Sequence, residues 1–149
     1  MSHDDWPTSE LAREWTHRGI TCRVYVADYF NNGYKRPNGY VELPEDHPAR
    51  HLNLQWDDYE VFDVHGGITY GGCGSRVIGW DTAHHGDNWA GDPNKPGKLW
   101  TVDDVEDETT RLADQVADLY TPEAVAMFKA SRTLRELADE LDPTKETHA

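Results

Sequence analysis

Two glycine-rich stretches of the sequence, residues 64–70 and 79–87, concentrate the side chains that could do chemistry. Two histidines and two aspartates in these stretches are the candidates: His65, Asp81, His84 and Asp87. Neutral imidazoles and carboxylates are the usual ligands of zinc, manganese or iron, and such a metal polarises a phosphoryl or carbonyl oxygen. One prediction is therefore a divalent metal ion held by Asp81, His84 and Asp87.

A second interpretation of the same stretches needs no metal. Asp81 could orient His65 or His84 as a general base, while backbone N–H groups of the glycine-rich turn face an anion. These three residues are the predicted catalytic groups. The Asp-x-x-His-x-x-Asp spacing matches no closed ligand signature, so both interpretations stay open. Each residue also has a purely structural interpretation, because such side chains often hydrogen-bond to nearby backbone.

Aromatic and basic residues accompany the two stretches. Tyr70 and Trp80 are predicted walls against which a flat ligand such as a nucleobase would stack, although core packing also explains them. Arg76 and the backbone of Gly66 and Gly67 are predicted to contact a phosphate. The two glycines alone do not make a phosphate loop, because neither a GxxxxGK run nor a GxGxxG run occurs.

The elements that position these residues follow from local patterns, beginning with a helix over residues 8–18. Thr8 can cap this helix, Leu11 and Trp15 lie four residues apart on one face, and Gly19 supplies a stop. The sequence therefore predicts that an N-terminal helix packs on the sheet.

β-branched and aromatic residues in rough alternation predict strands. The last two predicted strands pair as a hairpin across the glycine turn at residues 71–75. Short turns between strands favour a mainly antiparallel sheet. The predicted strands are residues 20–26, 39–43, 59–70 and 76–81.

Helices are predicted after the sheet. A long loop over residues 82–98 has no periodicity, and apolar residues then recur at helical spacing from Thr101. Thr121 and Pro122 begin a further helix, which residues 131–133 could divide into two pieces. The predicted fold class is α+β: a mainly antiparallel sheet from residues 20–81, packed against the N-terminal helix and the C-terminal helices.

Length and composition exclude several classes of protein. The 149 residues suit one domain over residues 1–142 with a flexible tail at 143–149. A net charge of -14 argues against nucleic-acid binding, because phosphate contacts need clustered Lys and Arg. No apolar run is long enough for a membrane span and the first residues lack the features of a secretory signal, so we expect a cytoplasmic protein.

The motifs at residues 64–70 and 79–87, together with Gly39 to Pro44, resemble those of a family of small uncharacterised proteins encoded by bacteriophages and prophages. The resemblance implies an accessory phage-type gene product that acts in the cytoplasm of a bacterial host. It brings no activity with it.

The leading functional hypothesis is a small phosphorylated or nucleotide-like ligand in a cleft between the 66–75 turn and the 82–98 loop. Hydrolysis is the most plausible reaction if the site is catalytic, with His84 as base or metal ligand and Asp81 orienting it. The alternative is a non-catalytic inhibitor or interaction protein that binds a host factor through its acidic helical face. The sequence does not predict the oligomeric state.

Overall fold

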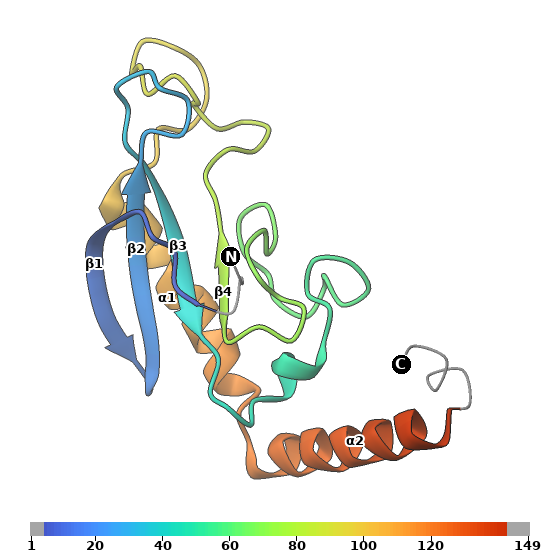
Figure 1. Cartoon of the computed structure of the whole chain (residues 1–149). Helices are drawn as coiled ribbons and strands as arrows, with labels where there is room; N and C mark the ends of the chain where they lie inside the picture. Colours follow the sequence, from blue (N-terminus) through green and yellow to red (C-terminus); the bar gives the residue numbers. More distant parts are fainter. Residues whose placement is uncertain (1–4, 143–149) are drawn as a thin grey trace.

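The computed structural model describes residues 5–142, with side chains at all of these positions except 132 and 135. A four-stranded antiparallel sheet forms its centre, and strands that follow one another along the chain are neighbours in it. Helix α1 lies across one face of the sheet, whereas α2 extends away from it (Figure 1). The predicted α+β class and antiparallel sheet are confirmed. The elements are β1 (Glu10–His17), β2 (Ile20–Ala27), β3 (Arg36–Glu42), the 3₁₀ helix η1 (Pro48–His51), β4 (Val77–Trp80), α1 (Val102–Asp118) and α2 (Pro122–Leu141).

The predicted N-terminal helix is wrong, because its residues form β1. Two side chains of β1 that are two residues apart reach α1: the indole N–H of Trp15 donates to Thr110, and His17 contacts Asp114. A strand places residues two apart on one face, whereas a helix would turn them away from each other. Contacts with residues more than ninety positions away therefore decide the conformation of this segment.

β1 is one of the two edge strands of the sheet, and within the described residues it pairs with β2 alone. The pairing of the two strands shifts register between Leu11 and Arg13, which marks a β-bulge. Arg18 and Gly19 both have positive φ angles, 50° and 81°, and reverse the chain between the strands. Gly19 is thus part of a hairpin turn and not the end of a helix.

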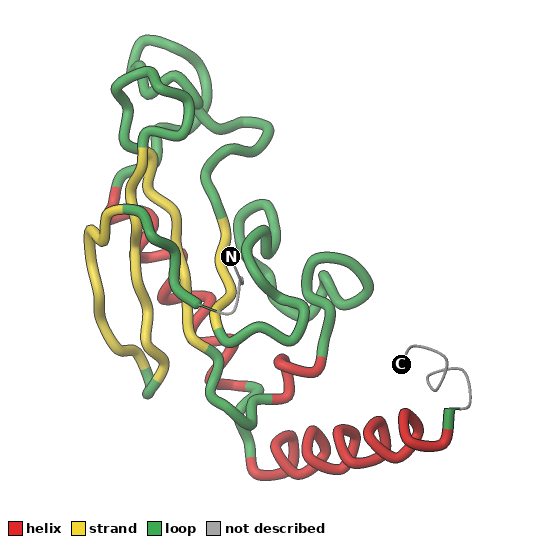
Figure 2. The backbone as a smooth tube through the Cα atoms, viewed as in Figure 1, coloured by secondary structure: helices red, strands yellow, loops and turns green. Residues whose placement is uncertain are grey.

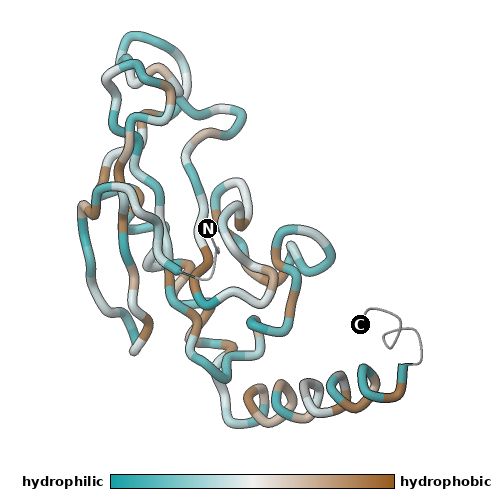
Figure 3. The backbone as a smooth tube through the Cα atoms, viewed as in Figure 1, coloured by the Kyte–Doolittle hydropathy of each residue, from teal (hydrophilic) through white to brown (hydrophobic). Residues whose placement is uncertain are grey.

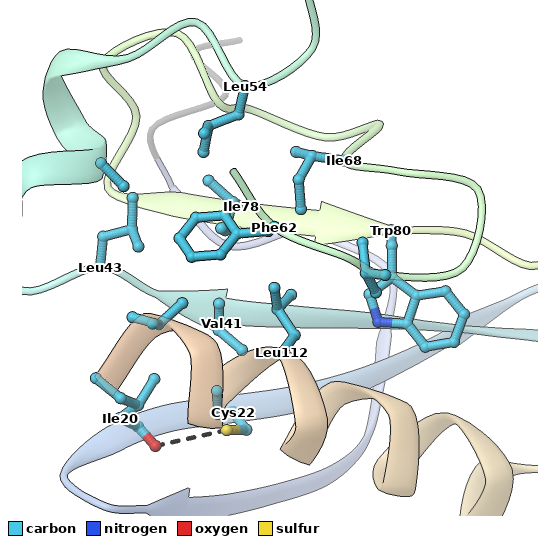
Figure 4. Close-up of a cluster of buried hydrophobic side chains, with 14 of the residues drawn as sticks. Ile20, Cys22, Val41, Leu43, Leu54, Phe62, Ile68, Ile78, Trp80 and Leu112 are labelled. Carbon is cyan, nitrogen blue, oxygen red and sulfur yellow. Dashed lines mark hydrogen bonds between the residues drawn. The ribbon is translucent and has the colours of Figure 1, made fainter. Parts of the chain in front are cut away.

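The main core lies between the sheet and α1. Val41 of β3 and Leu112 of α1 are both fully buried there. Apolar side chains of the long connection after β3 pack into the same cluster (Figure 4). These are Leu54, Phe62 and Ile68. Full burial of one such side chain stabilises the fold by about 1.5–3 kcal/mol.

Residues 59–68 form a loop, so most of the strand predicted over 59–70 is absent from the sheet. Side chains of α1 take the hydrogen bonds that a neighbouring strand would otherwise take. The backbone N–H of Asp63 donates to Oε1 of Gln115 at 2.7 Å, and Nε2 of Gln115 donates to the carbonyl of Asp63 at 2.8 Å. The apolar alternation in this segment therefore serves the core without any strand pairing.

What remains of the predicted hairpin is a short pairing at the end of that loop. The backbone N–H groups of Thr69 and Tyr70 both donate to the carbonyl of Gly79 in β4, and the N–H of Gly79 donates to the carbonyl of Tyr70. The prediction that residues 76–81 form a strand is confirmed by β4, which brings Trp80 and the residues after it close to the 64–70 stretch. The loops on both sides make up most of the chain between β3 and α1 (Figure 2).

Both predicted C-terminal helices are confirmed. Thr101 and Asp104 form a capping box at the start of α1, and Thr121 with Pro122 begins α2. Residues 131–133 do not divide the second of these helices into two pieces, because α2 runs without interruption to Leu141.

α2 packs against η1. Phe128 is buried and its ring lies edge-on against His51 of η1, with centroids 5.6 Å apart. The helix extends away from the sheet with hydrophobic segments along it (Figure 3), and its Glu136 and Asp139 line a hollow together with Arg50 of η1. Its large exposed apolar side chains are Met127, Leu134, Leu137 and Leu141.

No helix in residues 5–142 combines the length and the apolar character needed to cross a membrane. The predicted flexible tail, residues 143–149, lies outside the described residues.

Candidate functional site

The two histidine-bearing stretches meet beside β4, as the sequence predicts. The imidazole rings of His65 and His84 are nearly perpendicular, with centroids 5.4 Å apart. Gly66 allows this approach, because a Cβ atom at its position would overlap the ring of His84. The glycine has a positive φ of 69°, so both its conformation and its lack of a side chain are used.

Asp87 lies at the centre of this histidine cluster, and its side chain is 1% exposed. Its Oδ2 accepts hydrogen bonds from Nε2 of His65 at 2.8 Å and from the backbone N–H of His84 at 2.9 Å. Its Oδ1 accepts the indole N–H of Trp100 at 2.8 Å. Burial by itself raises the pKa of Asp87, but these hydrogen bonds outweigh it and hold the pKa below its usual value.

The predicted metal ligands Asp81, His84 and Asp87 do not form a metal centre. Within residues 5–142, no group of three His, Cys, Asp or Glu side chains is arranged to hold a metal ion. The physical reason is that both oxygens of Asp87 already accept hydrogen bonds from protein donors. Asp87 is therefore a structural acceptor that fixes two loops.

His84 and Asp81 form a second, looser pair. Nε2 of His84 lies 2.9 Å from Oδ1 of Asp81, which is within ion-pair distance. The alignment is not that of a hydrogen bond, and the buried Nε2 atom has no hydrogen-bond partner among the described residues. Oδ1 of Asp81 instead accepts the backbone N–H of Ala83 at 3.0 Å.

A cavity of about 420 Å³ lies next to Asp81, on the face of the sheet opposite α1. The alternation of β3 places it there: Val41 packs in the core under α1, whereas Tyr40 belongs to a separate cluster with Tyr25 and Val77. Side chains from the N-terminal segment, the β2–β3 loop, β3 and the β4 region line the cavity: Pro7, Thr8, Ser9, Tyr29, Phe30, Arg36, Asn38, Tyr40, Thr69, Tyr70, Trp80, Asp81 and Ala83.

Three of the predicted site residues line this cavity, namely Tyr70, Trp80 and Asp81. The others do not, and they belong to the histidine cluster or to the surface: His65, Gly66, Gly67, Arg76, His84 and Asp87. The predicted pocket is thus divided. Asp81, which pairs with His84, and Trp80, whose ring packs against that of His65 with centroids 6.0 Å apart, connect the two halves.

Tyrosine rings form much of the cavity wall. Tyr40 and Tyr70 pack edge to face, with centroids 5.1 Å apart. Burial is the main cause that raises the pKa of both phenols, so they are neutral at pH 7. Tyr29 and Phe30 add two half-exposed rings, and Phe30 stacks on Trp89 with centroids 5.5 Å apart.

Arg36 is a cavity residue that is not among the residues predicted from the sequence. Its side chain is buried, and its guanidinium donates to the carbonyls of Thr82 at 3.0 Å and Trp89 at 2.6 Å. The guanidinium carbon also lies 4.8 Å from the ring centroid of Phe30. No carboxylate within residues 5–142 pairs with it, and its Nε atom has no hydrogen-bond partner there. The available signal was an arginine beside a predicted strand rich in apolar and aromatic residues.

The predicted phosphate contacts are engaged elsewhere. Arg76 forms ion pairs with Glu42 and with Asp5, at 3.0 Å for the second pair. The backbone N–H of Gly67 donates to the carbonyl of Val64 at 2.9 Å. Neither group is directed to the cavity by these contacts.

Comparison of the chain with protein-family models, with curated proteins and with solved structures finds no match. The resemblance of its motifs to those of bacteriophage and prophage proteins therefore stays a prediction.

Proposed function

We propose that this protein binds a small, flat ligand of the nucleobase or nucleoside type in the cavity on the open face of the sheet. The observation that carries the proposal is a cavity of about 420 Å³ with aromatic walls and a few polar groups. A concave, mostly apolar pocket with few polar groups is the usual form of a small-molecule site. Its aromatic rings are suited to stacking against a planar ligand.

The charges around the cavity favour a ligand without phosphate. Arg36 is the only Lys or Arg among the described residues that line it, and two N–H groups of its guanidinium already donate to backbone carbonyls. Asp81 adds a carboxylate to the same wall. A phosphate would thus meet a single cation, whose N–H groups are partly used already, beside a repelling anion.

Binding without turnover is better supported than hydrolysis. His65 and His84 do not line the cavity, and Nε2 of His84 is buried. A general base must come within hydrogen-bond distance of the proton that it removes. We further propose that the protein acts in the cytoplasm of a bacterial host as a phage-type gene product. The resemblance of its motifs is the sole support for this part of the proposal.

Calorimetric titration of the full chain with nucleobases, nucleosides and nucleotides tests the proposal. We expect saturable binding of at least one base or nucleoside, weaker binding of its phosphorylated form, and recovery of the ligand intact. Tyr29→Ala removes a half-exposed ring from the cavity wall and should weaken binding about tenfold, because base stacking on an aromatic ring contributes about 1–3 kcal/mol.

Tyr59→Ala is the matched control, since Tyr59 is also exposed but does not line the cavity. The Tyr59→Ala variant should bind the base or nucleoside with the same affinity as the unmodified protein. The proposal fails if no base or nucleoside binds, or if the two tyrosine variants bind equally well.

A further inference from the structure

Asp81 is a carboxylate in the cavity wall that pairs with no Lys or Arg among residues 5–142. It directly follows β4, and its side chain is 33% exposed. Oδ1 accepts the N–H of Ala83, and the nearest basic group is the imidazole of His84. Among residues 5–142, no hydrogen bond reaches Oδ2. An aromatic cavity therefore presents acceptor oxygens that are still able to receive hydrogen bonds.

Arg36 places a positive charge at the same end of the cavity. Its guanidinium donates to the carbonyl of Thr82, the residue that follows Asp81, yet Arg36 and Asp81 form no ion pair with each other. A ligand at this end thus meets a carboxylate beside a cation. The carboxylate favours N–H donors on the ligand, and the cation favours an acceptor oxygen next to them.

The edges of the common nucleobases differ in how they satisfy this arrangement. Guanine presents an amine, a ring N–H and a carbonyl in sequence, so two adjacent donors face a carboxylate and an acceptor lies beside them. Adenine and cytosine place an acceptor nitrogen next to the amine, which a carboxylate repels. Uracil and thymine place their ring N–H between two carbonyls, and hypoxanthine has the ring N–H without the amine.

We propose that Asp81 makes the cavity selective for a guanine-type edge, with two adjacent N–H donors on the carboxylate and a carbonyl toward Arg36. This inference rests on the proposed function, because it names the class of ligand that the same cavity takes. Asp81 is then the specificity-determining residue, and its function is binding and not catalysis.

The test compares guanosine, inosine, adenosine and xanthosine by calorimetric titration of the full chain. The unmodified protein should bind guanosine about tenfold more tightly than inosine, because a hydrogen bond to a charged group contributes about 1.5–3 kcal/mol. Asp81→Asn offers one donor and one acceptor, so it should lower the affinity for guanosine about tenfold and raise that for xanthosine. Asp57→Asn removes an equal charge from an exposed loop and should leave the order of affinities unchanged.

The outcomes separate this inference from the proposal on which it rests. If no nucleoside binds to the unmodified protein, the proposed function itself fails. A second outcome is that nucleosides bind and Tyr29→Ala weakens their binding, but the affinity for guanosine is no higher than that for inosine and adenosine. In that case only the proposed selectivity is overturned. The same holds if Asp81→Asn folds, as judged by circular dichroism, and keeps the original order of affinities. Should that variant not fold, the comparison of guanosine with inosine on the unmodified protein still decides the inference.

Discussion

Nε2 of His65 donates a hydrogen bond to Oδ2 of Asp87 across 2.8 Å, and this bond ties together two loops separated by 22 positions in the sequence. The same carboxylate also accepts the indole N–H of Trp100, which leads into α1. One buried side chain thus joins the 64–70 stretch, the loop after β4 and the start of a helix.

Asp87→Ala should lower the free energy of unfolding by about 2–4 kcal/mol, because it leaves partly buried donors of His65, His84 and Trp100 without an acceptor. Urea unfolding followed by circular dichroism measures the change. Asp57→Ala, at an exposed position, is the control and should change stability by less than about 0.5 kcal/mol. Equal stability of the two variants would contradict this account of the cluster.

The low pKa of Asp87 also predicts an acid dependence of stability. A carboxyl whose pKa is lower in the folded state stabilises the protein above its unfolded pKa of about 3.9, and this contribution is lost as the pH falls through the folded pKa. The stability difference between the unmodified protein and Asp87→Asn should therefore shrink as the pH falls below about 4. Unfolding curves at a series of pH values measure it, and a difference that grows in acid would refute the assignment.

Gly66→Ala and Gly67→Ala form a matched pair. Both glycines have positive φ, so alanine at either costs about 1 kcal/mol of backbone strain. Only the new Cβ at 66 would overlap the ring of His84, while that at 67 meets open space. Gly66→Ala should therefore be less stable than Gly67→Ala by about 2 kcal/mol in thermal unfolding. Similar losses would mean that His84 moves aside freely.

His47 should make stability depend on pH near neutrality. It is fully buried, its Nε2 donates to the carbonyl of Val116 at 2.7 Å, and its Nδ1 accepts the N–H of Ala49 at 2.9 Å. Burial lowers its pKa, so the unfolded chain takes up a proton first as the pH falls. The contribution of neutral His47 to the free energy of unfolding should be fully present above about pH 6.5. It should decline as the pH falls from there through the pKa of His47 in the folded protein. His47→Gln should remove this decline, and an unchanged pH profile would exclude His47 as its source.

Leucines in the two helices should respond differently to truncation. Leu112 of α1 is fully buried, and Leu112→Ala should cost about 2–5 kcal/mol in urea unfolding. Leu134 of α2 is 67% exposed, and Leu134→Ala should cost less than about 0.5 kcal/mol. A large loss at Leu134 would show that the outer part of α2 is covered in solution.

Helices and strands that are marked by residues within or next to them could be predicted from the sequence. Thr101 and Thr121 cap α1 and α2 through their own side chains, and β-branched residues identify β2 and β4. β1 could not be recognised, because the contact of Trp15 with Thr110 is invisible in a local pattern. Residues 59–68 were mistaken for a strand because their alternation is real, but Gln115 satisfies their backbone from a helix.

The candidate site could be predicted only in part. The approach of His65 to His84 follows from two glycine-rich stretches at the same end of β4. The cavity was missed because Arg36 and Tyr40 reach it from the strand face opposite α1, and a strand predicted from residue 39 left Arg36 out. Which face of a strand carries a site depends on where α1 packs, and no local pattern contains that information.

The bulge in β1 has a consequence for how molecules of this protein behave toward one another. An outermost strand exposes unpaired backbone groups that can recruit a strand from another chain and start aggregation. Here the irregular register and the charged side chains of Glu10, Arg13 and Glu14 make that border a poor template. The sheet is thereby protected against uncontrolled growth into fibres at this side.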